Sequence, residues 1–234
     1  MKKAAIILGA LICAASTQAY AFDFSKAVSV SKEAMKNRSI PTVGGEDDSN
    51  IVFDVSDPEY DWSQTESKKI KVELKSDGLV LESKEEDGVA FTIAELPIDI
   101  EEGSEFMFGV TLVGPKLDDK KSLGIIFDYE DARNYKALAI YKKQFDYFVV
   151  KDGTVSSVKT GLVKMKGNTY TIVMTRENGK VEFKLNDLEI CTLKKVSITN
   201  AMFGAFIHGK MKAMMPCFYM HNADREETEQ STTD

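Results

Sequence analysis

Short runs of alternating apolar and polar residues, separated by turn residues, fill most of the chain over 51–222. In the segment 180–186, Val181, Phe183 and Leu185 alternate with polar residues, so one face is apolar and the other polar. This period of two is typical of a half-buried β-strand, because successive strand side chains point to opposite faces of a sheet. The pattern therefore predicts β-structure for this region.

Tight turns join several of these runs and strengthen the prediction. Ser76-Asp77-Gly78, Lys151-Asp152-Gly153 and Glu177-Asn178-Gly179 each lie between two alternating segments. Asn, Asp and Gly tolerate the positive φ that two-residue hairpin turns require. Repeated hairpins without intervening helices predict an all-β fold of two stacked antiparallel sheets. The methionine-rich segment 211–215 is expected to be a loop packed on the edge of this sandwich. The expected strands are 51–56, 69–75, 78–83, 89–94, 105–113, 122–130, 134–141, 145–150, 169–176, 180–186, 201–208 and 216–221.

Two of these strands differ from the others in polarity. The segments 123–129 and 135–141 are apolar on both faces, whereas 180–186 has one polar face. A strand that is apolar on both faces of an antiparallel sandwich is either covered by a loop or lines a concave groove. This contrast indicates where a binding site would lie.

The first 21 residues have the composition of a secretory signal peptide. Lys2 and Lys3 precede the apolar run 4–15, and Ala19-Tyr20-Ala21 is a small-residue cleavage pattern. The apolar run is shorter than the roughly 20 residues that cross a bilayer. We therefore expect a mature chain that begins at Phe22, has no membrane span and is exported, either to the periplasm or as a secreted protein.

The charge of the mature chain restricts the classes of partner that it is expected to bind. Removing Lys2 and Lys3 takes the formal net charge from −7 to −9. Nucleic acids and anionic membranes attract a basic face, so an acidic chain is not expected to bind either of them. We expect a lead-in over 22–50, one domain over 51–222 and a disordered acidic tail over 223–234.

One series of motifs points to a known fold family. The loop sequence Phe127-Asp-Tyr-Glu-Asp-Ala-Arg-Asn-Tyr135 is followed by the strands 170–175 and 180–186, and then by the Gly-containing strand 203–206. This order resembles the concanavalin A-like jelly rolls, in particular laminin-G domains and bacterial 3-keto-disaccharide hydrolase-like domains. The resemblance implies a two-sheet jelly-roll sandwich whose 127–135 loop joins two strands of the concave sheet. It does not select an activity, because this superfold carries lectins, hydrolases and adhesion modules.

Catalytic motifs are weak along the whole chain. Jelly-roll glucanases use a Glu-x-Asp-x-x-Glu strand, but the one comparable segment, 59–64, ends in Gln and lies in a polar connection. A nucleophilic triad needs a histidine beside an activated serine. The chain contains His208 and His221, but it has no Gly-x-Ser-x-Gly motif that would supply the serine. The residues therefore favour a non-catalytic protein.

The loop after residue 127 also collects oxygen ligands. Asp128, Glu130, Asp131 and Asn134 could together hold a calcium ion, as some sandwich lectins do. Their spacing lacks the Asp-x-Asp-x-Asp-Gly pattern, and a solvated turn with an Asn cap explains the same residues. No cofactor is expected, and calcium remains an unsupported alternative.

Aromatic residues gather around the same loop, whereas Trp62, the single tryptophan, lies in a polar segment far from it in sequence. Sugar sites combine aromatic faces with a few fixed polar groups, although tyrosines in strands also serve as cross-strand packing. Both interpretations stay open at this point. On the first of them, the candidate ligand-binding residues are Asp128, Tyr129, Arg133, Asn134, Tyr135, Tyr141 and Tyr147.

Cys191 and Cys217 are the cysteines of the expected mature chain, an even number in an exported protein. A bridge between them would close a loop of roughly 25 residues and stabilise the fold by about 3.5 kcal/mol. Two buried thiols would look the same in the sequence, so the disulfide is an open alternative.

These observations predict an exported, lectin-like sandwich that binds a carbohydrate or glycoconjugate without catalysis. A glycoside-active enzyme of the 3-keto-disaccharide hydrolase-like kind is the first alternative, which the family resemblance permits. The second is an envelope or matrix module whose partner is another protein.

Overall fold

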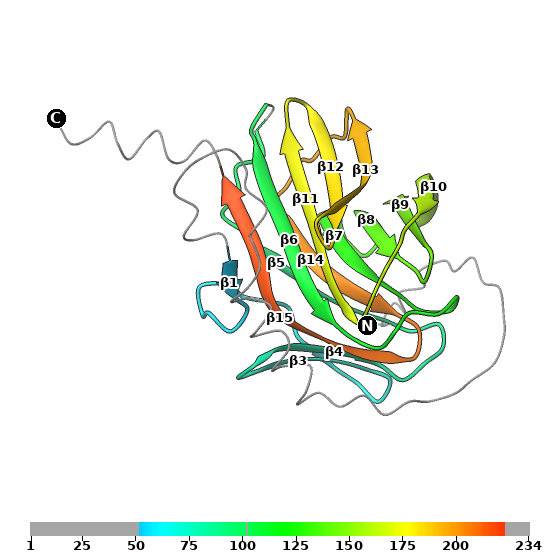
Figure 1. Ribbon diagram of the computed structural model, residues 1–234. Coiled ribbons are helices and arrows are strands. Elements are labelled where there is room, and N and C mark those ends of the chain that lie inside the picture. Colours follow the sequence, from blue (N-terminus) through cyan, green and yellow to red (C-terminus); the bar gives the residue numbers. More distant parts are fainter. Residues whose placement is uncertain (1–51, 102, 223–234) are drawn as a thin grey trace.

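The computed structural model describes residues 52–101 and 103–222, which form two antiparallel sheets without a helix (Figure 1). The predicted signal peptide, the lead-in and the acidic tail lie outside the described residues. In order, the larger sheet contains β13 (Leu188–Lys194), β12 (Lys180–Leu185), β11 (Thr169–Glu177), β6 (Phe106–Val113), β15 (Met211–Asn222), β4 (Gly78–Ser83), β3 (Ile70–Lys75) and β2 (Thr65–Glu66), and β1 (Val52–Asp54) pairs with β15. The smaller sheet contains β10 (Thr154–Leu162), β9 (Gln144–Lys151), β8 (Asn134–Ile140), β7 (Ser122–Asp131), β14 (Met202–His208) and β5 (Val89–Glu95).

Residues from both sheets pack between them in one continuous hydrophobic core. Phe108 from the larger sheet lies 4.9 Å, centroid to centroid, from Phe203 of the smaller one. This two-layer arrangement is the predicted jelly-roll sandwich. No helix among the described residues is long and apolar enough to span a membrane.

The predicted hairpin turns are confirmed. Asp152 and Gly153 have φ of 51° and 78°, and Asn178 and Gly179 have φ of 50° and 68°. Positive φ at both central residues is what the right-handed twist of a two-residue hairpin requires. These turns fix the registers of β9 with β10 and of β11 with β12, because a two-residue loop leaves no freedom to slip.

Three strands, the two-residue β2 together with β10 and β13, were not predicted, and β15 begins earlier than expected. In β10 every residue except Gly161 is exposed, so the strand has no alternation of buried and exposed positions that a sequence pattern could show. In β13 a register shift interrupts the alternation. The predicted loop at 211–215 is wrong: Met211 and Met215 point into the core from the first half of β15, and Met214 is buried on its other face.

Trp62 is also placed differently from the prediction. Its side chain is 2% exposed, and its ring lies 5.2 Å from the Phe218 ring in an edge-on contact. Phe53 and Tyr60 pack against the same Phe218 ring. The polar segment around Trp62 therefore anchors the connection before β2 to the core, and one apolar residue in a polar context gives no periodic signal.

The smaller sheet has a second apolar face, which points away from the core. Ile125 and Phe127 of β7 belong to the core between the sheets, whereas Ile126 belongs to a separate cluster on the opposite face. In β8, Leu138 faces the core, and Ala137 joins Ile126 in the second cluster. The double-sided apolarity of these strands thus has a structural counterpart, and we call this second surface the outer face of the smaller sheet.

Candidate functional site

A pocket opens on the outer face of the smaller sheet. Its lining comes from the five neighbouring strands β5, β14, β7, β8 and β9 and from the turn between β7 and β8. The lining surface is almost entirely hydrocarbon. The lining residues are Val89, Phe91, Ile126, Tyr129, Ala132, Tyr135, Ala137, Phe148 and Phe206. Small residues such as Ala137 leave space between the larger rings, and the pocket forms there.

Aromatic rings form a continuous wall of this pocket. The ring of Tyr129 lies 6.1 Å from those of both Phe91 and Tyr135, tilted by 41° and 33° respectively. Tyr135 in turn meets Phe148 edge-on, with centroids 6.4 Å apart. Contacts of this kind hold aromatic rings in fixed orientations, so the wall is preorganised for a flat ligand surface.

A backbone irregularity brings Tyr129 to this wall. The register of β7 with β8 shifts between Phe127 and Asp131, and Asp128 has a φ of 51°. The extra residue of a bulge redirects the side chains that follow it. Tyr129 therefore packs on the outer-face cluster beside Tyr135 instead of following simple alternation from Phe127.

Glycine is required beneath the pocket at one position. A Cβ on Gly124 of β7 would lie 1.9 Å from the Leu138 carbonyl oxygen and 2.8 Å from a ring carbon of Phe206. The absence of a side chain lets the Phe206 ring lie across β7. The floor of the pocket therefore depends on close backbone approach at this glycine.

The hydroxyl of Tyr135 is the one buried side-chain polar atom of the lining without a hydrogen-bond partner among the described residues. The side chain is 5% exposed, and its oxygen is buried. Burial, followed by the neighbouring Tyr129, raises the pKa of Tyr135 well above its usual value, so the phenol stays protonated. A buried hydroxyl without a partner is costly, and a ligand that supplied an acceptor or a donor would remove that cost.

Asp128 lies elsewhere and has a structural task. Its carboxylate is 6% exposed, pairs with the Lys136 ammonium, and accepts hydrogen bonds from the Thr199 amide at 2.7 Å and the Thr199 hydroxyl at 2.9 Å. Burial opposes its ionisation, but Lys136 and the Thr199 bonds outweigh burial and hold the pKa of Asp128 below its usual value. Asp128, one of the predicted ligand-binding residues, therefore ties the loop before β14 to β7 and is not part of the pocket lining.

Arg133 and Asn134 bind the neighbouring hairpin. The Arg133 guanidinium donates to the Asp152 carbonyl at 2.8 Å, and the Asn134 side-chain oxygen accepts from the Asp152 amide at 3.0 Å. The Asn134 amide nitrogen donates to both carboxylate oxygens of Asp131. Both predicted residues thus lie beside the pocket, next to Ala132, with their polar groups engaged in holding two turns together.

The remaining two predicted tyrosines fall on different faces. Tyr141 packs against the outer-face cluster but is not part of the pocket lining. Tyr147 points into the core between the sheets, where it stacks on Phe127 at 6.1 Å and contacts Phe183. Burial raises the pKa of Tyr147 to about 12. Strand alternation turns Tyr147 inward, so it does not lie with Tyr129 and Tyr135 in the pocket.

The structure thus joins Tyr129 and Tyr135 with residues that were not predicted as site residues, foremost Phe91, Phe148 and Phe206. A signal for them exists in the sequence. The segments 89–94 and 145–150 also carry apolar residues on both faces, as 123–129 and 135–141 do. Applying the same criterion to every strand would have found most of the pocket.

The calcium and disulfide alternatives can be compared with the same geometry. The described residues contain no group of three His, Cys, Asp or Glu side chains that could hold a metal ion. Cys191 and Cys217 lie on β13 and β15, with three strands between them. At about 4.8 Å per strand, their backbones are roughly 19 Å apart. A disulfide requires Cα atoms within about 7 Å, so these two residues are not bridged to each other.

Comparison with known proteins identifies the fold. No family model matches the sequence, and no curated protein sequence matches it. Among solved structures, the metal-free carbohydrate recognition domain of Emp46p is similar, with a TM-score of 0.54, 11% sequence identity, and coverage of 68% of this chain and 87% of that one. The carbohydrate recognition domain of Emp47p has a TM-score of 0.53, 11% identity, and coverage of 71% and 89%. The predicted fold, a jelly-roll sandwich of two antiparallel sheets, is therefore confirmed.

Proposed function

We propose that this protein is a binding module whose ligand, a carbohydrate or glycoconjugate, packs against the aromatic wall of the shallow pocket on the outer face of the smaller sheet. The observation that carries the proposal is the preorganised wall formed by Phe91, Tyr129 and Tyr135. A pyranose ring presents a flat face of C–H groups, and such a face packs well on aromatic rings. The similarity to carbohydrate recognition domains supports the same class of ligand.

The position of Tyr135 gives the proposal a polar contact. Its buried hydroxyl lacks a partner, so a sugar hydroxyl that reached it through a shift of the neighbouring rings would gain a hydrogen bond and relieve an unsatisfied group. Other sugar hydroxyls would remain in water at the pocket mouth. A ligand held mainly by C–H contact, with a single buried hydrogen bond, fits this lining.

A second candidate follows from the hydrocarbon character of the pocket. Apart from the two tyrosine hydroxyls, the lining offers alkyl and aromatic groups alone. An acyl chain or a similar apolar group would also bury its surface there. A glycolipid would satisfy both candidates.

The catalytic alternative would need acid–base groups at the site. Among the described residues, the pocket lining includes no carboxylate, amine or imidazole. Asp128, the buried carboxylate of the β7 bulge, is held by Lys136 and Thr199. We therefore favour binding over glycoside cleavage, and incubation of the protein with oligosaccharides tests this choice by the appearance of shorter products.

A glycan array followed by titration of the strongest binders tests the main proposal. Tyr129→Ala removes a wall ring and is expected to weaken affinity about fivefold, since an aromatic contact contributes on the order of 1 kcal/mol. Tyr141→Ala is the matched control, because Tyr141 packs on the same outer-face cluster outside the pocket. If no glycan on the array bound and fatty acids displaced a fluorescent apolar dye from the protein, the proposed carbohydrate ligand would be wrong. The ligand would then be an apolar molecule.

We also propose that the chain is exported after cleavage behind Ala21. The supporting observation is the basic, apolar and small-residue order of residues 2–21. N-terminal sequencing of the protein recovered from its native compartment should begin at Phe22. An intact Met1 terminus on the mature protein would contradict export by this signal.

A further inference from the structure

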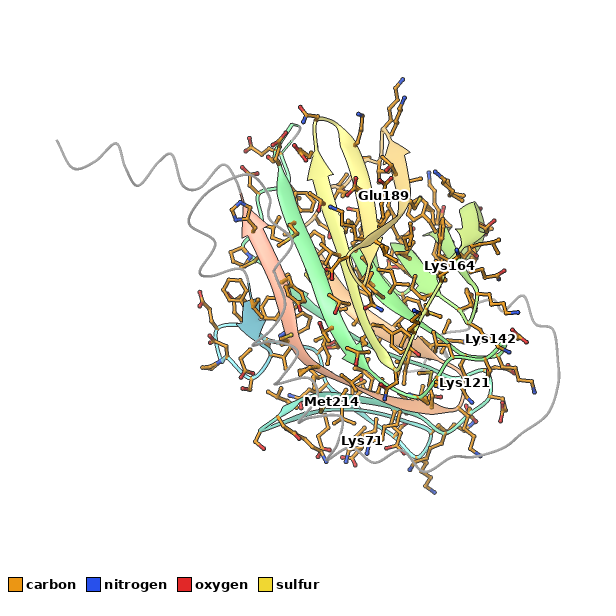
Figure 2. The ribbon with its side chains drawn as sticks, viewed as in Figure 1. Lys71, Lys121, Lys142, Lys164, Glu189 and Met214 are labelled. Atoms are coloured by element: carbon orange, nitrogen blue, oxygen red, sulfur yellow. The ribbon has the colours of Figure 1, made fainter. Side chains whose placement is uncertain are left out.

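Lysines are concentrated at one end of the sandwich. The three connections β6–β7 (114–121), β8–β9 (141–143) and β10–β11 (163–168) contain seven lysines and two aspartates, a formal charge of +5 in a chain whose total is −7. Figure 2 shows Lys121, Lys142 and Lys164 on the same side of the molecule. We call these three connections the lysine end. Its lysines are Lys116, Lys120, Lys121, Lys142, Lys143, Lys164 and Lys166.

Backbone hydrogen bonds hold the three connections together. The Val163 amide donates to the Lys143 carbonyl at 2.9 Å, which ties β10–β11 to β8–β9. The Gly114 amide donates to the Asn168 carbonyl at 3.0 Å, which ties β6–β7 to β10–β11. The lysines are therefore carried by one ordered surface, and their charges act together on a partner that approaches this end.

Acidic residues neutralise this surface in part. Asp118 pairs with Lys121 at 2.8 Å, and Asp119 is exposed beside it. The acidic turn with Glu85, Glu86 and Asp87 leads into β5 at the same end of the sandwich, two strands from β7, and counting its three carboxylates against the +5 of the three connections leaves +2. The lysine end thus keeps a positive field in spite of the acidic composition of the chain.

An exposed apolar residue lies within the same surface. Leu162, at the end of β10, is 87% exposed, more than any other large hydrophobic residue of the described chain. It pairs with Gln144 of β9, directly beside Lys143, and Lys164 follows two residues later. A leucine surrounded by lysines is the combination that binds an anionic bilayer, because the leucine enters the interface while the amines meet the headgroups.

We propose that the lysine end, together with Leu162, is a peripheral binding site for anionic lipid membranes. The net charge alone led to the expectation that this chain does not bind anionic membranes. The proposal departs from that expectation, because the net charge does not describe how the charges are distributed over the surface. This inference is independent of the proposed carbohydrate site, which lies on the outer face of the smaller sheet. Lysine amines would bind lipid phosphates as point charges, without selecting one headgroup structure.

Flotation of the purified protein with vesicles tests the proposal. Binding is expected to phosphatidylcholine vesicles that contain phosphatidylglycerol, and not to pure phosphatidylcholine, and it should weaken as salt is added. The variant K142Q/K143Q/K164Q should bind about a hundredfold more weakly, since each lysine near an anionic surface contributes about fivefold. The matched control is K151Q/K180Q/K194Q, which makes the same change in net charge with exposed lysines at the opposite end, and it should bind like the unmodified protein.

Leu162→Ser separates a membrane from a soluble polyanion. The side chain is exposed, so the fold should be unaffected, but vesicle affinity should fall about tenfold as its apolar contact is lost. Equal loss in both triple variants, or no binding to anionic vesicles, would overturn the proposal. Retention of heparin by the unmodified protein, with vesicle binding insensitive to Leu162→Ser, would assign the lysine end to a soluble polyanion instead.

Discussion

The hydroxyls of two buried tyrosines have opposite effects on the stability of the fold. The hydroxyl of Tyr170 donates to the Pro115 carbonyl at 3.0 Å, whereas that of Tyr135 has no partner among the described residues. The first oxygen is compensated for the water it loses on folding, and the second is not. The unsatisfied hydroxyl of Tyr135 therefore lowers the free energy of unfolding of the protein. A ligand that formed a hydrogen bond with this hydroxyl would recover that loss.

Replacement by phenylalanine tests this contrast. Tyr135→Phe is expected to raise the free energy of unfolding by about 1 kcal/mol, because it removes an unsatisfied polar atom and keeps the ring. Tyr170→Phe, the control, should lower it by about 1 kcal/mol, because a carbonyl loses its donor. Urea titration measures both variants, and a loss of stability in Tyr135→Phe would mean that its hydroxyl has a partner in solution.

Asp128 makes the stability of the fold depend on pH. Its pKa is lower in the folded protein than in the unfolded chain, so its contribution is present above the unfolded value near pH 4 and is lost as the pH falls further. Asp128→Asn should cost about 2 kcal/mol at pH 7, because the hydrogen bonds lose their charge and Lys136 loses its partner. Asn tolerates the positive φ at this position, so the variant tests the charge. The stability difference from the unmodified protein should shrink below pH 4, and a constant difference would contradict this account.

At the scale of elements, the strands of the smaller sheet differ in how firmly they are held. The central strand β14 pairs with both β5 and β7, and its residues between Phe203 and Ile207 are buried. The edge strand β10 pairs with β9 alone, has a register shift between Ser157 and Lys159, and is almost wholly exposed. Local opening therefore needs little free energy at β10 and much more at β14.

Hydrogen exchange should resolve these two strands. Amides of β10 are expected to exchange through local opening, orders of magnitude faster than those of β14, which exchange when the domain unfolds. Strand β9 serves as an internal control, because it is paired on both sides and should resemble β14. Equal protection in β10 and β14 would indicate that another segment pairs with the free edge of β10.

The same two strands show how far sequence can predict this fold. Strands with one buried face were mostly predicted to within a few residues, because alternation along the chain determines them. Strand β10 has neither a buried face nor a periodic pattern, and its place depends on pairing with β9. The start of β15 was missed because both of its faces are buried, so Met214 and Met215 are adjacent without alternation.

For the whole molecule, the arrangement of the sheets decides the state of the cysteines. Cys191 faces the core from β13, and Cys217 lies on the opposite face of the same sheet, next to Tyr219. A loop-closing bridge between them would have stabilised the fold by about 3.5 kcal/mol. Since the two residues are several strands apart, that contribution is absent.

Thermal unfolding with and without reductant tests this arrangement. The midpoint is expected to be the same under both conditions, because no bond between Cys191 and Cys217 is available to reduce. Mass spectrometry after alkylation under denaturing conditions should find both thiols modified without prior reduction. A midpoint that falls by several degrees in reductant would require another arrangement of β13 and β15.

The candidate site was predicted in part, for reasons that belong to the whole fold. Tyr129 and Tyr135 were identified because they belong to the aromatic group around the loop 127–135, but Phe91 and Phe206 come from strands that only the sheet order brings beside them. Tyr147 was assigned to the site from proximity in sequence, although alternation turns it to the core. The uneven distribution of lysines was equally hidden, because loops far apart in the chain meet at one end.

The separation of the two apolar faces of the smaller sheet has a consequence for how such a protein can diverge. Ile125 and Leu138 build the core between the sheets, whereas Ile126 and Ala137 on the same strands face the pocket. Substitutions at the outward positions alter the pocket without touching the contact between the sheets. Over many generations the recognition surface can change while the inward residues continue to specify the same sandwich. Distant relatives should therefore be recognisable by alternate residues of β7 and β8, and should differ in ligand at the residues between them.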